Sequence, residues 1–147
     1  MTIIGSAARQ DATALLPLLK QLGYPQSLEE IENRIALFSE QDGYGIAVAE
    51  RDKKIIACIA WSTTMIFVSS RVRIHVEGLV VDNQYREQGI GKKLMHFLED
   101  YARAFCPCII DLTSGQRRAK DGSHDFYKKQ GYLNEGPMAK FYFRKEL

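Results

Sequence analysis

The sequence has no long apolar run, no marked excess of charge of either sign and few cysteines. A transmembrane helix needs about 20 consecutive apolar residues, and no such stretch occurs, so we expect no membrane association. The N-terminus has no basic segment followed by an apolar one, which is the pattern of a secretory signal. A formal net charge of +2, without a long basic run, argues against nucleic acid as a partner.

The three cysteines are Cys58, Cys106 and Cys108. Three thiols cannot form a complete disulfide framework, and Cys106-Pro107-Cys108 has no second pair of zinc ligands. We therefore interpret them as reduced thiols in a core, and we expect a cytoplasmic location and no metal site. A length of 147 residues, with 46% apolar and 26% charged residues, predicts a single domain over residues 1–147.

Helices and strands alternate in the predicted secondary structure. Apolar residues spaced three and four apart predict helices, and runs of β-branched residues predict strands. Helices are expected at 10–22, from Ser27 to about residue 38, at 90–105 and at 123–130. Strands are expected at 2–5, 46–50, 55–63, 71–81, 108–112, 132–134 and 139–144, with a tight hairpin turn at 51–54.

Residues 71–81 form the predicted central strand. Its first half alternates between apolar residues and the polar residues Arg73, His75 and Glu77. Gly78 lies where this pattern changes, because both faces are apolar beyond it. Glycine inside a strand often marks a bulge or a close backbone approach, so we expect the sheet to open near this point.

The segment after this strand predicts a phosphate site. Gly89 and Gly91 leave backbone N–H groups unshielded, and a helix that begins beside them adds free donors and the positive end of its dipole. A dinucleotide-binding motif would need glycine where Leu94 stands, and a P-loop would need Ser or Thr where Lys93 stands. The pattern that remains is Arg86-x-x-Gly89-x-Gly91, a candidate site for a pyrophosphate.

This pattern after a buried strand resembles the acetyl-CoA pyrophosphate loop of the GNAT-type N-acetyltransferases. Residues 123–132 (SHDFYKKQGY) resemble a second block of that family, A-H-x-F-Y-x-x-x-G followed by Phe or Tyr. Residues 3–24 also resemble the opening strand and helix of the family. The resemblance therefore covers nearly the whole chain.

The chain departs from the family pattern at two positions. Ser123 stands where Ala is usual, and Lys120 stands where many members have Asn or Arg. Arg117 or Arg118 could take over the contact to the far end of the cofactor.

The resemblance implies an α/β domain with a mixed, mostly antiparallel sheet, flanked by helices and splayed between its fourth and fifth strands. It implies transfer of an acetyl group from acetyl-CoA to a primary amine, by direct attack in a ternary complex. The pantetheine arm would pair with the strand backbone, and the pyrophosphate would rest on the loop. The cofactor-binding residues so implied are Leu79, Val80, Val81, Arg86, Glu87, Gln88, Gly89, Ile90, Gly91 and Lys92.

The reaction needs a base, an acid and a hydrogen-bond donor. An ammonium group with a pKa of about 10.4 must lose its proton to become a nucleophile. Glu77 is the candidate base and His75 the reserve, although Glu77 could instead be a solvated carboxylate or a binder of positive charge. Tyr127 is the candidate acid, with a core tyrosine as the alternative. A backbone N–H near Val80 would stabilise the oxyanion.

Several alternatives remain open at this point. The acyl donor could be another acyl-CoA, and the acceptor could be a protein lysine or N-terminus. A CoA-binding regulatory or interaction module without turnover is a further reading. Cationic acceptors would favour an acidic groove, for which the candidates are Glu29, Glu30, Glu32, Asp42 and Glu77. Homodimers are common in the family, and the C-terminal strands are a candidate contact.

Overall fold

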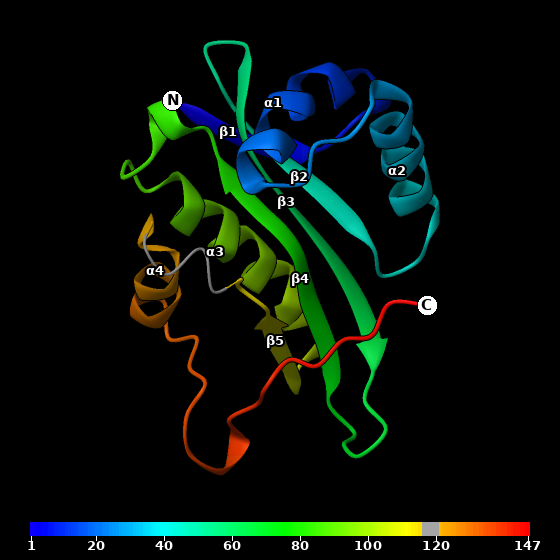
Figure 1. The fold of residues 1–147 in the computed structure, drawn as a ribbon, viewed down its shortest axis with the longest axis vertical. Coiled ribbons are helices and arrows are strands. Elements are labelled where there is room, and N and C mark those ends of the chain that lie inside the picture. Colours follow the sequence, from blue (N-terminus) through cyan, green and yellow to red (C-terminus); the bar gives the residue numbers. More distant parts are fainter. Residues whose placement is uncertain (116–120) are drawn as a thin grey trace. The chain divides into compact units, whose positions relative to one another are not determined.

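A computed structural model describes residues 1–115 and 121–147, and backbone contacts divide the chain into two compact units, 1–110 and 111–147 (Figure 1). The single domain expected over residues 1–147 stays a prediction. The three candidates for the far end of the cofactor, Arg117, Arg118 and Lys120, lie outside the described residues.

A five-stranded sheet in the order β1-β2-β3-β4-β5 organises the first unit. Neighbouring strands from β1 to β4 are antiparallel, whereas β5 runs parallel to β4. This arrangement confirms the predicted α/β fold with a mixed, mostly antiparallel sheet. The strands are β1 (Thr2–Ser6), β2 (Gly45–Arg51), β3 (Lys54–Met65), β4 (Val72–Val81) and β5 (Cys108–Leu112).

Helices cover both faces of this sheet. The helices α1 (Ala12–Leu22) and α2 (Leu28–Glu40) bury apolar residues against Val48, Cys58 and Val80 on one face. The helix α3 (Ile90–Ala102), which connects β4 to β5, packs on the other face. None of the helices in the described ranges is long and apolar enough to cross a membrane.

Trp61 lies on the α3 side of the sheet, where its ring contacts those of Phe97 and Tyr101 at centroid distances of 6.3 and 5.3 Å. Trp61 is 7% exposed, so it packs in the core. Gly45 on the neighbouring strand makes this possible, because a Cβ there would stand 2.3 Å from Trp61 Cζ2.

Local sequence signals set the ends of several elements as expected. Ser27 caps α2, with its hydroxyl accepting from the Glu30 N–H at 3.1 Å while the Glu30 carboxylate accepts from the Ser27 N–H. Asp52 and Lys53 adopt positive φ angles of 51° and 63°, as a two-residue hairpin turn requires. Cys58 lies in the core, but Cys106 is exposed, so the interpretation of all three cysteines as core thiols is wrong for Cys106.

A β-bulge interrupts β4 at Glu77. Ala60 of β3 pairs with Gly78, but the next residue, Trp61, pairs with Val76, so Glu77 has no partner in the β3 ladder. The bulge expected from Gly78 is therefore confirmed. The bend falls between the alternating first half of the strand and its apolar second half.

The C-terminal unit contains the helix α4 (Ser123–Lys129) and a 3-10 turn at Gly136–Met138. Gly131 follows α4 with a φ of 89°, which fits the predicted helix stop. The strands expected at 132–134 and 139–144 were wrong, since neither segment is a strand. Instead, the Asn134 side chain accepts from the N–H of Lys140 and donates to its carbonyl oxygen, so it occupies groups that a ladder would have used.

Candidate active site

The second half of β4 presents alternate backbone groups to the two sides of the strand. The N–H of Asp82 donates to Ile56 of β3 at 2.8 Å. Because successive residues of a strand point their N–H and C=O groups in opposite directions, the backbone groups of Val80 also face β3. Those of Leu79 and Val81 face the other side, where the Val81 carbonyl accepts from Arg86 Nε at 3.2 Å.

Beyond Gly78, this other side of β4 has no strand partner among the described residues. The N–H of Val72, at the start of β4, donates to the carbonyl of Pro107, just before β5, at 3.3 Å. The parallel β5 has 5 residues and β4 has 10, so β5 ends well before β4 does. The splaying inferred from the resemblance thus corresponds to a strand edge at 79–81 that faces no other strand among the described residues, with the Val81 carbonyl accepting from Arg86.

The loop after β4 turns on two residues with positive φ, Glu87 at 62° and Gly89 at 79°. Gly89 is the N-cap of α3, and no side chain caps this helix. The first intrahelical bond runs from the Lys93 N–H to the Gly89 carbonyl at 3.1 Å. The preceding N–H groups of Ile90, Gly91 and Lys92 therefore have no acceptor within the helix.

This loop fits a pyrophosphate. A Cβ built on Gly89 meets no protein atom within 4 Å, so the space above the loop is open. Lys92 and Lys93 are exposed in the first turn of α3, where the helix dipole disfavours cations unless an anion is bound. The exposed Glu87 carboxylate repels a bound anion, and it is the one acidic side chain of the loop segment 86–93.

Arg51, at the end of β2, binds the loop that follows β4. This contact was not predicted from the sequence. Arg51 donates from Nη1 to Gln88 Oε1 at 2.7 Å, and its Nε and Nη2 donate to Thr2 Oγ1 at 3.0 and 2.9 Å. Its guanidinium also lies 5.9 Å from the centre of the Tyr85 ring. No local signal could have predicted this contact, because Arg51 and Gln88 are 37 residues apart in the sequence.

Polar side chains line the α1 face of the sheet near the bulge. Glu77 is exposed, and its Oε1 accepts a hydrogen bond of 2.7 Å from the buried Ser62 hydroxyl. Its strand neighbours His75 and Arg73 lie 3.1 Å apart, between Nδ1 and Nη2. Glu77 and His75 therefore belong to one polar region on β4, as the alternation predicted.

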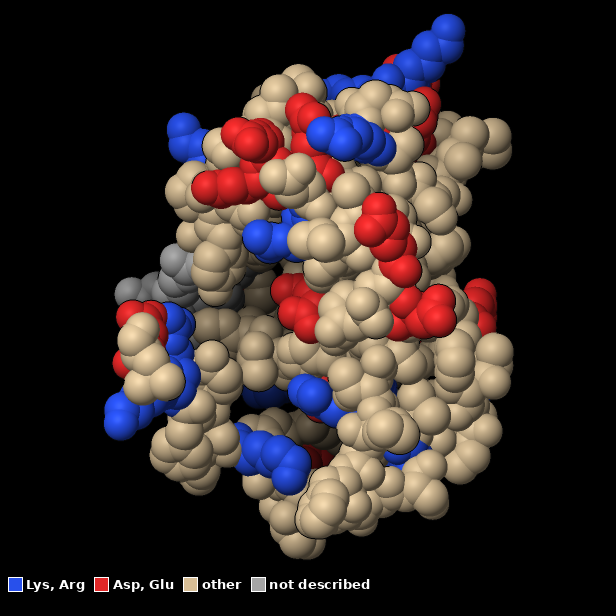
Figure 2. Space-filling view, turned by 90° about the vertical axis from the view of Figure 1, so that its right-hand side faces the viewer, with Lys and Arg blue, Asp and Glu red and all other residues tan. Residues whose placement is uncertain are grey.

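Acidic side chains gather on the face where α2 lies, as Figure 2 shows. Four of the five acidic groups on α2 and the following turn are exposed, and Arg34 is the basic residue among them. The exposed carboxylates are those of Glu29, Glu30, Glu40 and Asp42, and Glu32 pairs with Arg9 at 3.2 Å.

Tyr127 lies on α4 in the C-terminal unit. It is half-buried, and its ring lies 5.2 Å from that of Phe126 and 6.5 Å from that of Tyr132. In the same unit, a ring nitrogen of His124 lies 3.2 Å from the Gly115 carbonyl oxygen. In the first unit, His96 lies 4.0 Å from Glu99 on the surface of α3. The described residues contain no cluster of three or more side chains that could hold a metal ion.

The site combines a strand edge that faces no other described strand, a loop of unshielded N–H groups and a helix N-terminus. The comparisons with known proteins agree with this geometry. The sequence model of the acetyltransferase (GNAT) family matches residues 11–132. A GNAT family acetyltransferase from Staphylococcus aureus has the same fold, with a TM-score of 0.80 and 23% identity, over 99% of this chain and 98% of that chain.

Two further solved structures are similar. Glucosamine-6-phosphate N-acetyltransferase from Arabidopsis thaliana has a TM-score of 0.76 and 25% identity, over 98% of this chain and 99% of that chain. An aminoglycoside N-acetyltransferase in complex with CoA has a TM-score of 0.82 and 16% identity, over 100% of this chain and 96% of that chain. Since the family match also spans both the strand edge and the loop, the chain belongs to the GNAT family of acetyltransferases.

Proposed function

We propose that this protein is an N-acetyltransferase that moves the acetyl group of acetyl-CoA to a primary amine, by direct attack in a ternary complex. The observation that carries the proposal is the set of N–H groups at Ile90, Gly91 and Lys92, which have no intrahelical acceptor and lie beside open space at Gly89. Such a set binds a phosphate or pyrophosphate. The CoA-bound relative supports this choice of ligand.

Each part of the proposed site has a task. Acetyl-CoA would supply an activated acetyl thioester. The loop 88–92 would hold the pyrophosphate, and the backbone of Leu79 and Val81 would pair with the pantetheine arm. Because the Val80 N–H faces β3, the N–H near Val80 that would donate to the acetyl oxygen is that of Leu79 or Val81.

Glu77 is the proposed base, acting directly or through water. Its Oε1 is already hydrogen-bonded to Ser62, which leaves Oε2 to accept the proton of the amine. A carboxylate on the sheet face can also attract a cationic acceptor, and the acidic groups of α2 would add to that attraction. Tyr127 is the proposed acid that protonates the leaving thiolate.

The acceptor class is tested with a panel of amines. Thiol release from acetyl-CoA is measured with amino sugars, polyamines, lysine-containing peptides and peptide N-termini. Thiol release with one class of amine identifies that class as the acceptor. The panel is repeated with longer acyl-CoA donors, and release with these donors alone would show that acetyl-CoA is not the acyl donor. CoA binding by calorimetry without thiol release across the panel would favour a binding module. The cytoplasmic location and the homodimer stay predictions.

Tyr127→Phe tests the proposed acid. We expect kcat to fall by about 10²-fold, because a positioned acid contributes roughly 10²–10⁴-fold, while CoA affinity stays within about twofold. Tyr132→Phe is the matched control, since it removes a hydroxyl from the ring 6.5 Å away. Equal kcat values for the two variants and the wild type would remove Tyr127 from the mechanism.

A further inference from the structure

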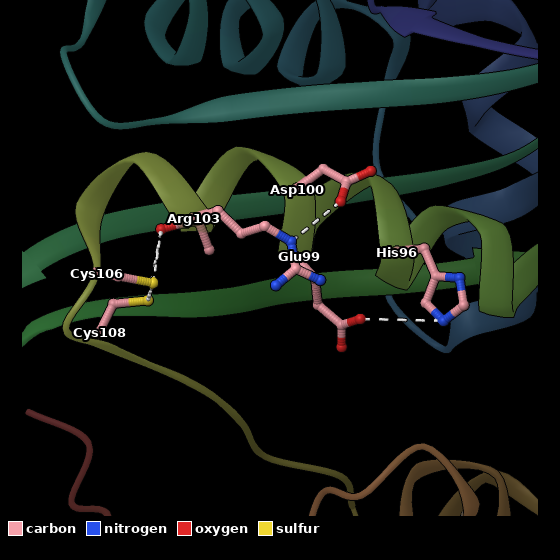
Figure 3. A network of polar contacts seen from close by, with 7 residues as sticks. His96, Glu99, Asp100, Arg103, Cys106 and Cys108 are labelled. Carbon is pink, nitrogen blue, oxygen red and sulfur yellow. Dashed lines mark hydrogen bonds and ion pairs between the residues drawn. The ribbon is translucent and has the colours of Figure 1, made fainter.

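The thiols of Cys106 and Cys108 lie close together in the connection from α3 to β5. They are not part of the loop and strand edge described above. The Sγ atoms of Cys106 and Cys108 lie 3.7 Å apart. Both thiols approach the carbonyl oxygen of Ala102, at 4.0 and 3.5 Å. Figure 3 shows the two side chains pointing toward each other at the end of the helix. Cys106 is exposed and Cys108 is half-buried, so solvent reaches the pair.

We propose that Cys106 and Cys108 form a reversible redox site, in which a small-molecule disulfide oxidises the two thiols to an intramolecular disulfide. A disulfide has an S–S length of about 2.05 Å, so the sulfur atoms must approach by about 1.6 Å. Rotation about the Cα–Cβ bonds supplies movements of this size, and neither side chain is locked in the core. The shared acceptor at Ala102 already holds both thiols on the same side of the chain.

A bound metal is the competing use of two adjacent thiols. In a tetrahedral site with Zn–S bonds of about 2.3 Å, two sulfurs stand about 3.8 Å apart, close to the observed distance. A structural zinc site, however, needs four ligands, and the described residues contain no cluster of three or more metal-binding side chains. Oxidation needs no ligand beyond the two sulfurs, so the surroundings favour the disulfide.

The two thiols differ in their readiness to react. Partial burial, followed by the hydrogen bond and charge of Cys106, raises the pKa of Cys108, although Arg103 and Arg71 act in the opposite direction. The more exposed Cys106 is therefore the first attacking thiol. Figure 3 shows Arg103, hydrogen-bonded to Asp100 at 3.3 Å, directly after the end of α3 and before the two thiols.

The exchange proceeds in two balanced steps. The Cys106 thiolate attacks a small disulfide RSSR, forming a Cys106–S–S–R mixed disulfide and releasing RS⁻, which takes up the proton that Cys106 lost. The Cys108 thiolate then attacks the Cys106 sulfur, forming the Cys106–Cys108 bond and releasing a second RS⁻, which is protonated in turn. Two protein thiols are oxidised by two electrons, and one RSSR is reduced to two RSH.

The test is intact mass spectrometry of the native protein in excess oxidised glutathione. We expect the wild type to lose two hydrogen atoms, peptide mapping to place the bond between Cys106 and Cys108, and dithiothreitol to reverse the change. The matched control Cys58→Ala removes the buried thiol and should behave in the same way. These readouts do not depend on acetyl transfer.

Single variants separate the two steps. Cys108→Ser should accumulate a stable glutathione adduct on Cys106, because the resolving thiol is missing. Cys106→Ser should form its adduct at least about tenfold more slowly, since the remaining thiol is less exposed and its partial burial raises its pKa. A wild type that keeps a glutathione adduct on Cys106, stays unmodified or links two chains would overturn the proposal.

Discussion

Two properties of Gly89 suit it to the proposed phosphate loop. Its φ of 79° lies in the left-handed region, and no protein atom stands within 4 Å of the place where its Cβ would be. The first property makes other residues costly, by about 1 kcal/mol. The second means that a side chain there would collide with a ligand and not with the protein.

Two substitutions at Gly89 separate backbone strain from occupation of the phosphate space. We expect Gly89→Ala to weaken CoA binding modestly, by about tenfold or less. Gly89→Glu should abolish binding, because it places a carboxylate where the pyrophosphate would lie. Calorimetric titration with CoA provides the measurement, and similar affinities for Gly89→Glu and the wild type would rule out this loop as the site.

Cys58 makes the stability of the protein depend on pH in the alkaline range. Burial raises the pKa of its thiol from 9.0 to about 12. Above pH 9.0 the unfolded chain ionises at this position while the folded chain keeps the proton. The folded state therefore binds more protons, and its stability falls as the pH rises toward about 12.

Urea unfolding at pH 8 and at pH 10.5 measures this effect. We expect the wild type to lose more stability between the two pH values than Cys58→Ala, which cannot ionise there. Both proteins need a reductant during the measurement, so that the other thiols do not interfere. Identical losses in the two proteins would mean that Cys58 does not carry the dependence.

At the scale of elements, the packing of β2 against β3 requires the small residue Gly45 opposite the large Trp61. A Cβ on Gly45 would stand 2.3 Å from Trp61 Cζ2, whereas a Cβ on Gly5 of β1 would meet nothing within 4 Å. We expect Gly45→Ala to lower the free energy of unfolding by about 1–3 kcal/mol through overpacking. The control Gly5→Ala should change it by about 0.5 kcal/mol or less, as measured by urea unfolding.

The elements that sequence reasoning placed correctly are those with local causes. Ser27 and Glu30 form a capping box within four residues, and Asp52-Lys53 is a turn that needs no distant partner. Gly78 indicated the bulge because a missing side chain interrupts a regular alternation. Most strand and helix ends followed the predicted ranges within two or three residues.

What could not be predicted depends on distant contacts. Arg51 reaches Gln88 through the folded sheet, and its sequence neighbours suggested only a solvated turn. The opening of the sheet beyond Gly78 was expected, but its extent depends on a distant contact, the hydrogen bond from Val72 to Pro107 that sets where β5 lies along β4. Residues 139–144 were expected to complete the sheet, but an aromatic segment supplies no partner strand by itself, and the rings of Phe141 and Phe143 are exposed.

At the scale of the whole molecule, the proposed ligand should stabilise the fold. A ligand that binds only the folded state at 100 times its dissociation constant adds about 2.7 kcal/mol. We therefore expect CoA to raise the midpoint of thermal unfolding by several degrees, by an amount that grows with the logarithm of its concentration. Gly89→Glu should show no rise, and an unchanged midpoint in the wild type would count against CoA binding.

The residues of the proposed site belong to both units of the chain. Glu77 and the loop lie in residues 1–110, and Tyr127 lies in residues 111–147. The roles of Glu77 and the loop are supported by contacts within one unit. The role of Tyr127 is supported by the family block at residues 123–132, and the kinetics of Tyr127→Phe test it.

The bulge in β4 makes Glu77 an insertion into an otherwise regular strand. Without it, Val76 and Gly78 would be consecutive, and the residues on both sides would keep their present partners in β3. Shortening the chain by this single residue should therefore yield a folded protein with a straightened strand. Comparing that deletion with Glu77→Gln would distinguish what the carboxylate contributes to turnover from what the bend contributes.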